Sequence, residues 1–199
     1  MSKLIIDLIA QCNNLDGGFT LWNNSNIIQL HKTADVIINP FSADINRRDI
    51  LTQLYKRMEH DALGEDLYMH TNKLLSEIEI GFRNIINSQD LNIESDSPDV
   101  LGLIKLMNVH FEVSDSLLEK MCDYMDTCRE YLGIRLFIFV NLKSFITGSE
   151  LYQLYDHSRY NKHILLLIEN RQSETIESES VRMIDEDLCE IRFSDEYYL

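Results

Sequence analysis

The sequence predicts an α/β fold built on a parallel-type sheet. Two runs, Leu136–Val140 and Ile164–Ile168, are apolar at every position. Such runs are typical of strands that helices cover on both faces. Between them, Thr147 and Glu150 have the spacing of a capping box, which predicts a helix through about His157. The order strand, helix, strand favours a parallel pair joined by a crossover helix.

The amino-terminal region predicts one helix and two short strands. Apolar residues between Leu4 and Ile9 recur at helical spacing, so we expect a helix that stops near Asn13. Residues 27–30 and 36–38 are short runs rich in β-branched side chains. Both runs are flanked by asparagine, and they predict two brief strands.

A long helical segment follows. From Asp49 to Asn87, apolar residues recur at helical spacing with polar residues between them. Gly64 is the expected break. We therefore expect two amphipathic helices, which form either a helical hairpin or an extended arm.

Three further elements precede the first apolar strand. Ser97 is placed to cap a helix whose first residue is Pro98. Residues 109–112 predict a short strand. Ser114 is placed to cap a longer helix, and Gly133 stands where a left-handed residue would end it.

The carboxyl-terminal region predicts a polar loop and an edge strand. Residues 173–180 are polar, and residues 189–193 alternate between apolar and polar side chains.

This region also holds much of the acidic excess. The whole chain has 18 lysines and arginines against 33 acidic residues, a net charge of -15, which argues against nucleic acid as a partner. Because DNA responds to local potential, a basic face elsewhere remains compatible with that total.

The motifs of common enzymes are missing from the sequence. No glycine is followed by lysine, and there is no GxGxxG, so nucleotide hydrolysis is not expected. There is no HExxH pair, no GxSxG elbow and no CxxC pair. We expect every histidine to be a surface or satisfied structural residue: His31, His60, His70, His110, His157 and His163.

Basic side chains provide the candidates for DNA binding. The pairs Arg47-Arg48 and Lys56-Arg57 lie about two and a half helical turns apart, so they could mark one stripe. Against this, six bases face eight acids between Asp44 and Arg83, and a solvated mixed-charge surface is the default interpretation. The basic candidates are Lys32, Arg47, Arg48, Lys56, Arg57, Lys73, Arg83, Lys105 and Lys143. We assign DNA binding to all of them except Arg83 and Lys105.

Three carboxylates lie between the helical segment and the α/β segment: Glu94, Asp96 and Asp99. In one interpretation they are solvated charges that favour the positive end of the following helix. In the other they bind calcium, which takes carboxylate and carbonyl oxygens from loops. The spacing is not that of an EF-hand loop, so the residues alone leave both interpretations open.

Four stretches carry a resemblance to a known family. They are DLNIESDSPDVLGLIKLMNVHFE (90–112), LFIFVNLKSFITGSEL (136–151), ILLLIE (164–169) and IDEDLCEI (184–191). In order, spacing and residue character they resemble the type II-A CRISPR-associated Csn-two family. The resemblance implies a head domain, residues 1–43 and 93–199, related to P-loop ATPase cores but without the nucleotide motif. Residues 44–92 would form a helical leg domain.

The same resemblance implies the function. Family members are non-enzymatic and bind the ends of double-stranded DNA during spacer acquisition in antiviral defence. They form homotetrameric rings that depend on calcium, and they work beside the Cas integrase and the Cas nine effector. The resemblance assigns calcium binding to Glu94 and Asp96. A competing hypothesis is a protein-binding assembly factor with little DNA affinity. No stretch reaches the length of a membrane span, so we expect a cytoplasmic protein with no membrane partner.

Overall fold

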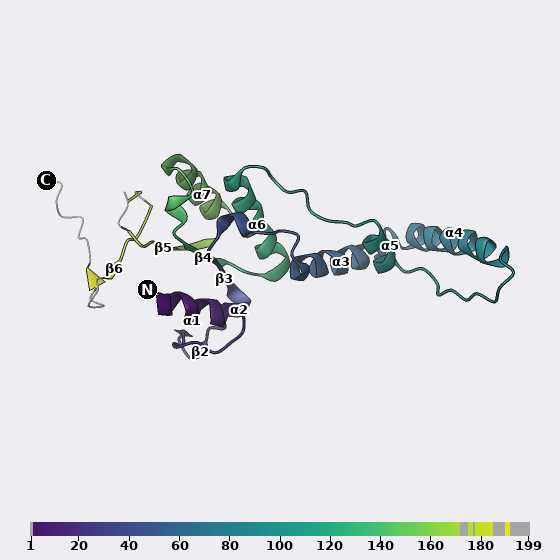
Figure 1. The fold of residues 1–199 in the computed structure, drawn as a ribbon, viewed down its shortest axis with the longest axis horizontal. Helices are drawn as coiled ribbons and strands as arrows, with labels where there is room; N and C mark the ends of the chain where they lie inside the picture. Colours follow the sequence, from purple (N-terminus) through teal and green to yellow (C-terminus); the bar gives the residue numbers. More distant parts are fainter. Residues whose placement is uncertain (1, 172–174, 177, 185–189, 192–199) are drawn as a thin grey trace.

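A parallel sheet forms the centre of the protein in the computed structural model, which describes residues 2–171, 175–176, 178–184 and 190–191 (Figure 1). Ile138 pairs with Val36 on one side and with Leu166 on the other, so the strand between them is central. This confirms the prediction for Leu136–Val140. The second apolar run, Ile164–Ile168, instead lies at an edge of this sheet, and its Ile164 and Leu166 are exposed. In spatial order, the strands are β3 (Ala34–Ile37), β4 (Leu136–Val140) and β5 (Ile164–Ile168).

Helices cover both faces of the sheet. On one face, Phe137 and Phe139 pack with residues of α3, α6 and α7. On the other face, Ile138 packs with residues of α1 and α2. Successive side chains of a strand point to opposite faces, so two-sided cover requires an apolar residue at every position of β4. The described residues hold α1 (Ser2–Cys12), α2 (Leu30–Thr33), α3 (Arg48–Ala62), α4 (Tyr68–Asn87), α5 (Val100–Leu106), α6 (Leu117–Leu132) and α7 (Gly148–Tyr160).

The helical segment is an extended arm and not a hairpin. Figure 1 shows α3 and α4 running outward from the sheet, with residues 88–99 returning to α5. α5 packs against α3. Gly64 lies in the break between the two arm helices, as predicted. α4 buries none of its residues in the isolated chain.

Two of the predicted helix ends are confirmed. Glu150 N–H donates to Thr147 Oγ1 at 3.3 Å, and Thr147 N–H donates to Glu150 Oε2 at 2.7 Å, which completes the capping box of α7. Gly133 adopts the left-handed conformation, φ 74°, at the end of α6. α7 itself continues to Tyr160, beyond the predicted end.

Two predicted caps are wrong by two residues. α5 is capped by Asp99, whose Oδ1 accepts from Gly102 N–H at 2.5 Å, so neither Ser97 nor Pro98 belongs to the helix. α6 is capped by Ser116. The hydroxyl of Ser114 donates instead to Asp123 Oδ2 at 2.5 Å, so it is not available as a cap.

Two predicted strands are also wrong, wholly or in part. Residues 109–112 form no strand. The side chain of Asn46 makes the backbone hydrogen bonds that a neighbouring strand would otherwise make. Its Oδ1 accepts from Phe111 N–H at 2.8 Å, and its Nδ2 donates to Phe111 O at 3.0 Å. Of residues 27–30, only Ile27 lies in a strand, and Leu30 begins α2, where it is 2% exposed in the core.

Short elements complete the fold. Two are 3-10 helices, η1 (Pro40–Ser42) and η2 (Leu142–Ser144). Two antiparallel pairs join β1 (Trp22–Asn23) with β2 (Asn26–Ile27) and β6 (Met183–Ile184) with β7 (Glu190–Ile191). β7 falls within the predicted edge strand, but it pairs outside the parallel sheet. Residues 189 and 192–193 of that prediction lie outside the described residues, as do 173, 174 and 177 of the predicted loop. The described helices include none that is long and apolar enough to cross a membrane.

Candidate functional site

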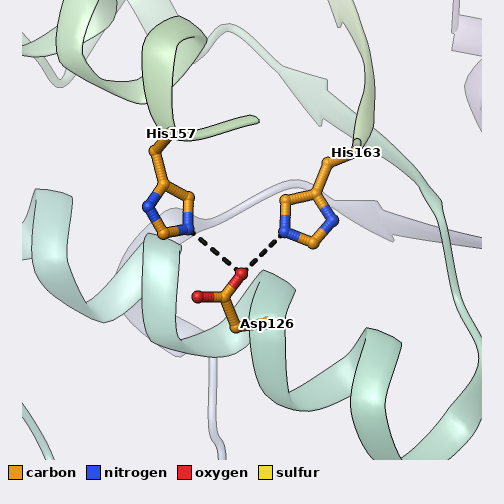
Figure 2. A group of neighbouring side chains, drawn as sticks. All are labelled: Asp126, His157 and His163. Atoms are coloured by element: carbon orange, nitrogen blue, oxygen red, sulfur yellow. Dashed lines mark hydrogen bonds and ion pairs between the residues drawn. The ribbon is translucent and has the colours of Figure 1, made fainter. Parts of the chain in front are cut away.

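Two histidines converge on one carboxylate (Figure 2). His157 Nε2 lies 3.1 Å from Asp126 Oδ1, and His163 Nε2 lies 2.7 Å from the same oxygen. Asp126 is on α6, His157 is on α7, and His163 immediately precedes β5. Within the described residues this is the one group of three or more histidine, cysteine or carboxylate side chains placed to hold a metal ion.

The turn between α7 and β5 brings the two histidines together. Lys162 adopts a left-handed conformation, φ 56°, and His163 N–H donates to Ser158 O at 2.8 Å, so the chain folds back on the helix end. The imidazole of His163 is fully buried and meets the ring of Phe137 edge to face, with centroids 5.4 Å apart. Its ring is therefore held by the core, while Asp126 and His157 remain partly exposed.

Burial and hydrogen bonding act in opposite directions on His163. Burial lowers the pKa of its imidazole, and the neighbouring Asp126 carboxylate only partly restores it, so the neutral ring is favoured. Asn161 Nδ2 lies 3.0 Å from His157 Nε2 and 3.5 Å from Asp126 Oδ2. Sequence reasoning missed this cluster, because two histidines on either side of a helix end match no motif and Asp126 lies 31 residues before His157.

The cluster lies at the amino-terminal edge of the parallel sheet. β4 begins at Leu136 and β5 begins at Ile164, directly after His163. Nucleotides bind open α/β sheets at the opposite edge, beyond the carboxyl ends of the strands. The cluster is therefore distinct from the place where a nucleotide would sit in such a sheet.

A different polar group occupies the carboxyl-terminal edge. Lys143, just after β4, places Nζ 2.7 Å from Glu179 Oε1, and both side chains are largely buried. Tyr155 donates its hydroxyl to the same Glu179 oxygen at 2.5 Å. Burial alone would raise the pKa of Glu179, but the hydrogen bonds from Lys143 and Tyr155 outweigh it and leave the pKa below its usual value.

A family model described as CRISPR-associated protein (Cas_Csn2) matches residues 12–188. The chain belongs to this family. The match covers the parallel sheet, the arm and helices α2 to α7. It supports the type II-A resemblance inferred from the sequence, and it gives this Csn2-family protein a CRISPR-associated role.

Arg47, one of the predicted DNA-binding residues of this Csn2-family protein, makes its contacts inside the fold. Its Nη1 lies 2.8 Å from Asp35 Oδ2 and also contacts the hydroxyl of Tyr124, while its Nε lies 2.9 Å from Asp49 Oδ1. Asp35 is on β3, on the face of the sheet that α6 covers. DNA binding by Arg47 stays a prediction, but its guanidinium already neutralises a carboxylate at the edge of the core.

The other predicted cations divide into two groups. Arg57 Nη1 lies 2.5 Å from Glu130 Oε1, and Lys73 Nζ lies 3.9 Å from Glu77 Oε1. Together with Lys143, these residues have acidic partners. The second group is exposed and makes no ion pair with any residue that the structure describes: Lys32 on α2, and Arg48 and Lys56 on α3. Of the four residues of the predicted stripe, the two inner ones, Arg48 and Lys56, are therefore those without an ion pair to a described residue.

Glu94 and Asp96 lie in the irregular segment between α4 and α5, and both are exposed. Their carboxylate oxygens suit calcium by donor type. The neighbouring Asp99 is occupied as the cap of α5. No third carboxylate of the described residues joins the two in a group of metal-ligand geometry, so a calcium ion bound here requires further oxygens from backbone, water or another chain.

Proposed function

We propose that this chain is a non-enzymatic protein of CRISPR spacer acquisition that binds the ends of double-stranded DNA as a calcium-dependent homotetrameric ring. The observation that carries the proposal is the family match over residues 12–188. The division into an α/β head, residues 1–43 and 93–199, and a helical leg, residues 44–92, belongs to the same proposal. So does action beside the Cas integrase and the Cas nine effector.

The carboxyl edge of the sheet supports a non-enzymatic role. A P-loop enzyme needs a glycine-rich turn and a lysine that is available to phosphate. Lys143 is the lysine nearest the end of β4, and it is committed to Glu179. We therefore expect ATP turnover to stay at background with either magnesium or calcium present. Turnover that a single substitution in this chain abolishes would contradict the proposal.

Lys32, Arg48 and Lys56 are the cations best placed for DNA. They are exposed and free of ion pairs among the described residues. Arg48 and Lys56 are separated by about 12 Å along α3, since each residue adds about 1.5 Å. Contacts to phosphates carry no sequence information and release counterions, so affinity should fall steeply with salt and should not depend on sequence.

The test compares the unmodified chain with two variants by electrophoretic mobility on linear and closed circular duplexes with calcium present. The variant Lys32→Ala/Arg48→Ala/Lys56→Ala should bind linear DNA about tenfold or more weakly, with a shallower salt dependence. A charge-matched control, Lys3→Ala/Arg159→Ala/Arg171→Ala, changes three exposed cations outside the predicted set and should bind like the unmodified chain. Equal binding by both variants would show that DNA contacts lie elsewhere.

Calcium should act through Glu94 and Asp96. An ion that binds only the folded protein raises the melting temperature in proportion to the logarithm of its concentration above the dissociation constant. The change Glu94→Ala/Asp96→Ala should remove this rise and lower the tetramer fraction. The control Glu65→Ala/Asp66→Ala alters two exposed acids of the loop between α3 and α4 and should keep it. An undiminished calcium effect in the first variant would exclude these ligands.

A second candidate function is supported by the arm. α4 exposes apolar side chains, among them Met69 at 78% and Phe82 at 61%, and the chain carries a net charge of -15. Both properties suit a protein-binding assembly factor with little DNA affinity. The same mobility experiment separates the two candidates, because an assembly factor would retard neither linear nor circular DNA.

A further inference from the structure

We propose that Asp126, His157 and His163 bind a divalent transition-metal ion, with Zn²⁺ as the preferred occupant. The three ligand atoms lie within 4.8 Å of one another and come from two helices and from the residue that precedes a strand (Figure 2). The proposal concerns neither the predicted calcium ligands nor the proposed DNA-binding cations. It is independent of the proposed function.

The donor set selects the class of metal. Two imidazole nitrogens and one carboxylate oxygen suit zinc, which binds such ligands at about 2.0–2.2 Å. Calcium instead takes six to eight oxygens, which this group does not offer. With one oxygen and two nitrogens converging from three directions, the site has three of the four positions of a tetrahedral zinc centre.

The hydrogen bonding around His157 favours a cation. Its Nε2 lies 3.1 Å from a carboxylate oxygen of Asp126, which calls for an N–H on the ring. The same nitrogen lies 3.0 Å from Asn161 Nδ2, whose N–H groups call for a lone pair. One protonation state of the ring cannot satisfy both neighbours in this arrangement. A metal ion placed between Nε2 and Oδ1 takes one lone pair from each atom and replaces the hydrogen bond between them, while Asn161 Nδ2 keeps Asp126 Oδ2, 3.5 Å away, as its acceptor.

Burial holds one ligand in place and leaves the others accessible. His163 is fully buried against Phe137, so its Nε2 is directed at Asp126 before any ion arrives. Asp126 has 44% of its side chain exposed and His157 has 27%. An open depression of about 660 Å³ lies beside them, lined by Asp126, Arg129, Tyr131, Tyr160 and Asn161 among others. An ion can enter from this side, and a water molecule can take the fourth position.

A bound ion would join parts of the chain that otherwise meet only through packing. Asp126 precedes His157 by 31 residues and His163 by 37. Coordination would therefore tie α6 to α7 and to the residue that immediately precedes β5. Because the three ligands are brought together only by folding, binding should raise the melting temperature.

The test uses the full chain after treatment with a chelator. Calorimetry should show one Zn²⁺ per chain with a dissociation constant in the micromolar range or tighter, and Co²⁺ should give the strong visible absorption of a tetrahedral site. His157→Gln and Asp126→Asn should each weaken Zn²⁺ binding at least tenfold. His60→Gln changes a histidine that is 87% exposed and lies near the end of α3, and this variant should bind Zn²⁺ as the unmodified chain does.

Several outcomes would overturn the proposal. Absence of Zn²⁺ uptake, or of the Co²⁺ band, would leave the cluster as a hydrogen-bonded network. Equal uptake by the unmodified chain and by both folded cluster variants would place zinc on other groups. Glu94→Ala/Asp96→Ala and millimolar calcium should leave Zn²⁺ binding unchanged, so failure of the calcium site and failure of this site are distinguishable.

Discussion

A carboxylate on the core side of a central sheet needs a counter-charge, and Asp35 has one. Its neighbours Ala34 and Val36 pack on the α1 side of β3, so alternation directs Asp35 toward α6. There it accepts hydrogen bonds from Arg47 at 2.8 Å and from the hydroxyl of Tyr124 at 2.6 Å. Burial, together with the neighbouring Cys128 and Asp35, raises the pKa of Tyr124 far above its usual value. The phenol therefore remains a hydrogen-bond donor.

Replacing Arg47 with methionine should destabilise the protein. The change keeps much of the side-chain volume but leaves Asp35 without its cation, and removing one member of a buried pair costs about 3–5 kcal/mol. Because the pair is partly exposed, we expect about 2–3 kcal/mol, measured from the urea midpoint. Arg57→Met breaks an exposed pair with Glu130 and should move the midpoint little. Similar small shifts in both variants would show that the Asp35 pair is not a structural requirement.

The described cysteines should be unreactive in the folded protein. Burial raises the pKa of Cys12 and of Cys122 to about 11 and that of Cys128 to about 12. At pH 8 a thiol of pKa 11 is about 0.1% thiolate, against roughly a quarter for an ordinary cysteine. In a Cys189→Ser background, reaction with Ellman's reagent should be at least a hundredfold slower than in denaturant. Rapid reaction of the native protein would contradict this assignment.

At the scale of elements, substituting alanine for either of two glycines should change the free energy of unfolding in opposite directions. An added Cβ would meet nothing within 4 Å at either Gly133 or Gly81. Gly133 has φ 74°, which costs an alanine about 1–2 kcal/mol, whereas Gly81 lies inside α4, where alanine gains about 0.5–1 kcal/mol. Urea unfolding should therefore show Gly133→Ala destabilised and Gly81→Ala stabilised. Changes of the same sign would mean that backbone conformation does not control these sites.

A predicted element is confirmed where residues close in the sequence decide it, and it is wrong where a contact from elsewhere decides it. The capping box of Thr147 and the left-handed Gly133 were predictable, because each is decided within a few residues of the chain. The cap of α6 was not, because Ser114 and Ser116 are both acceptable and the choice follows from Asp123, which engages Ser114. Likewise, the predicted strand at 109–112 is replaced by the contact of Phe111 with Asn46, 65 residues earlier.

For the whole molecule, the arm predicts self-association. α4 leaves Phe82 and Ile85 exposed at 61% and 58% in the isolated chain. An amphipathic helix with no covered side needs a partner. Light scattering with calcium present should give about four times the chain mass of 23.3 kDa. Phe82→Glu/Ile85→Glu should reduce that mass, whereas Asn84→Glu, at an exposed polar position, should not. A monomer at tens of micromolar would contradict the ring.

The sequence by itself determined the family, the α/β class, the central position of Leu136–Val140 and the helical segment broken at Gly64. Each of these follows from residue character along a short stretch, or from the order of such stretches. The structure decided that the helical segment is an arm and that Arg47 is paired inside the fold. It also decided that Asp126, His157 and His163 meet. These outcomes depend on which distant side chains folding brings into contact, and spacing along a single chain does not encode such contacts in any local pattern.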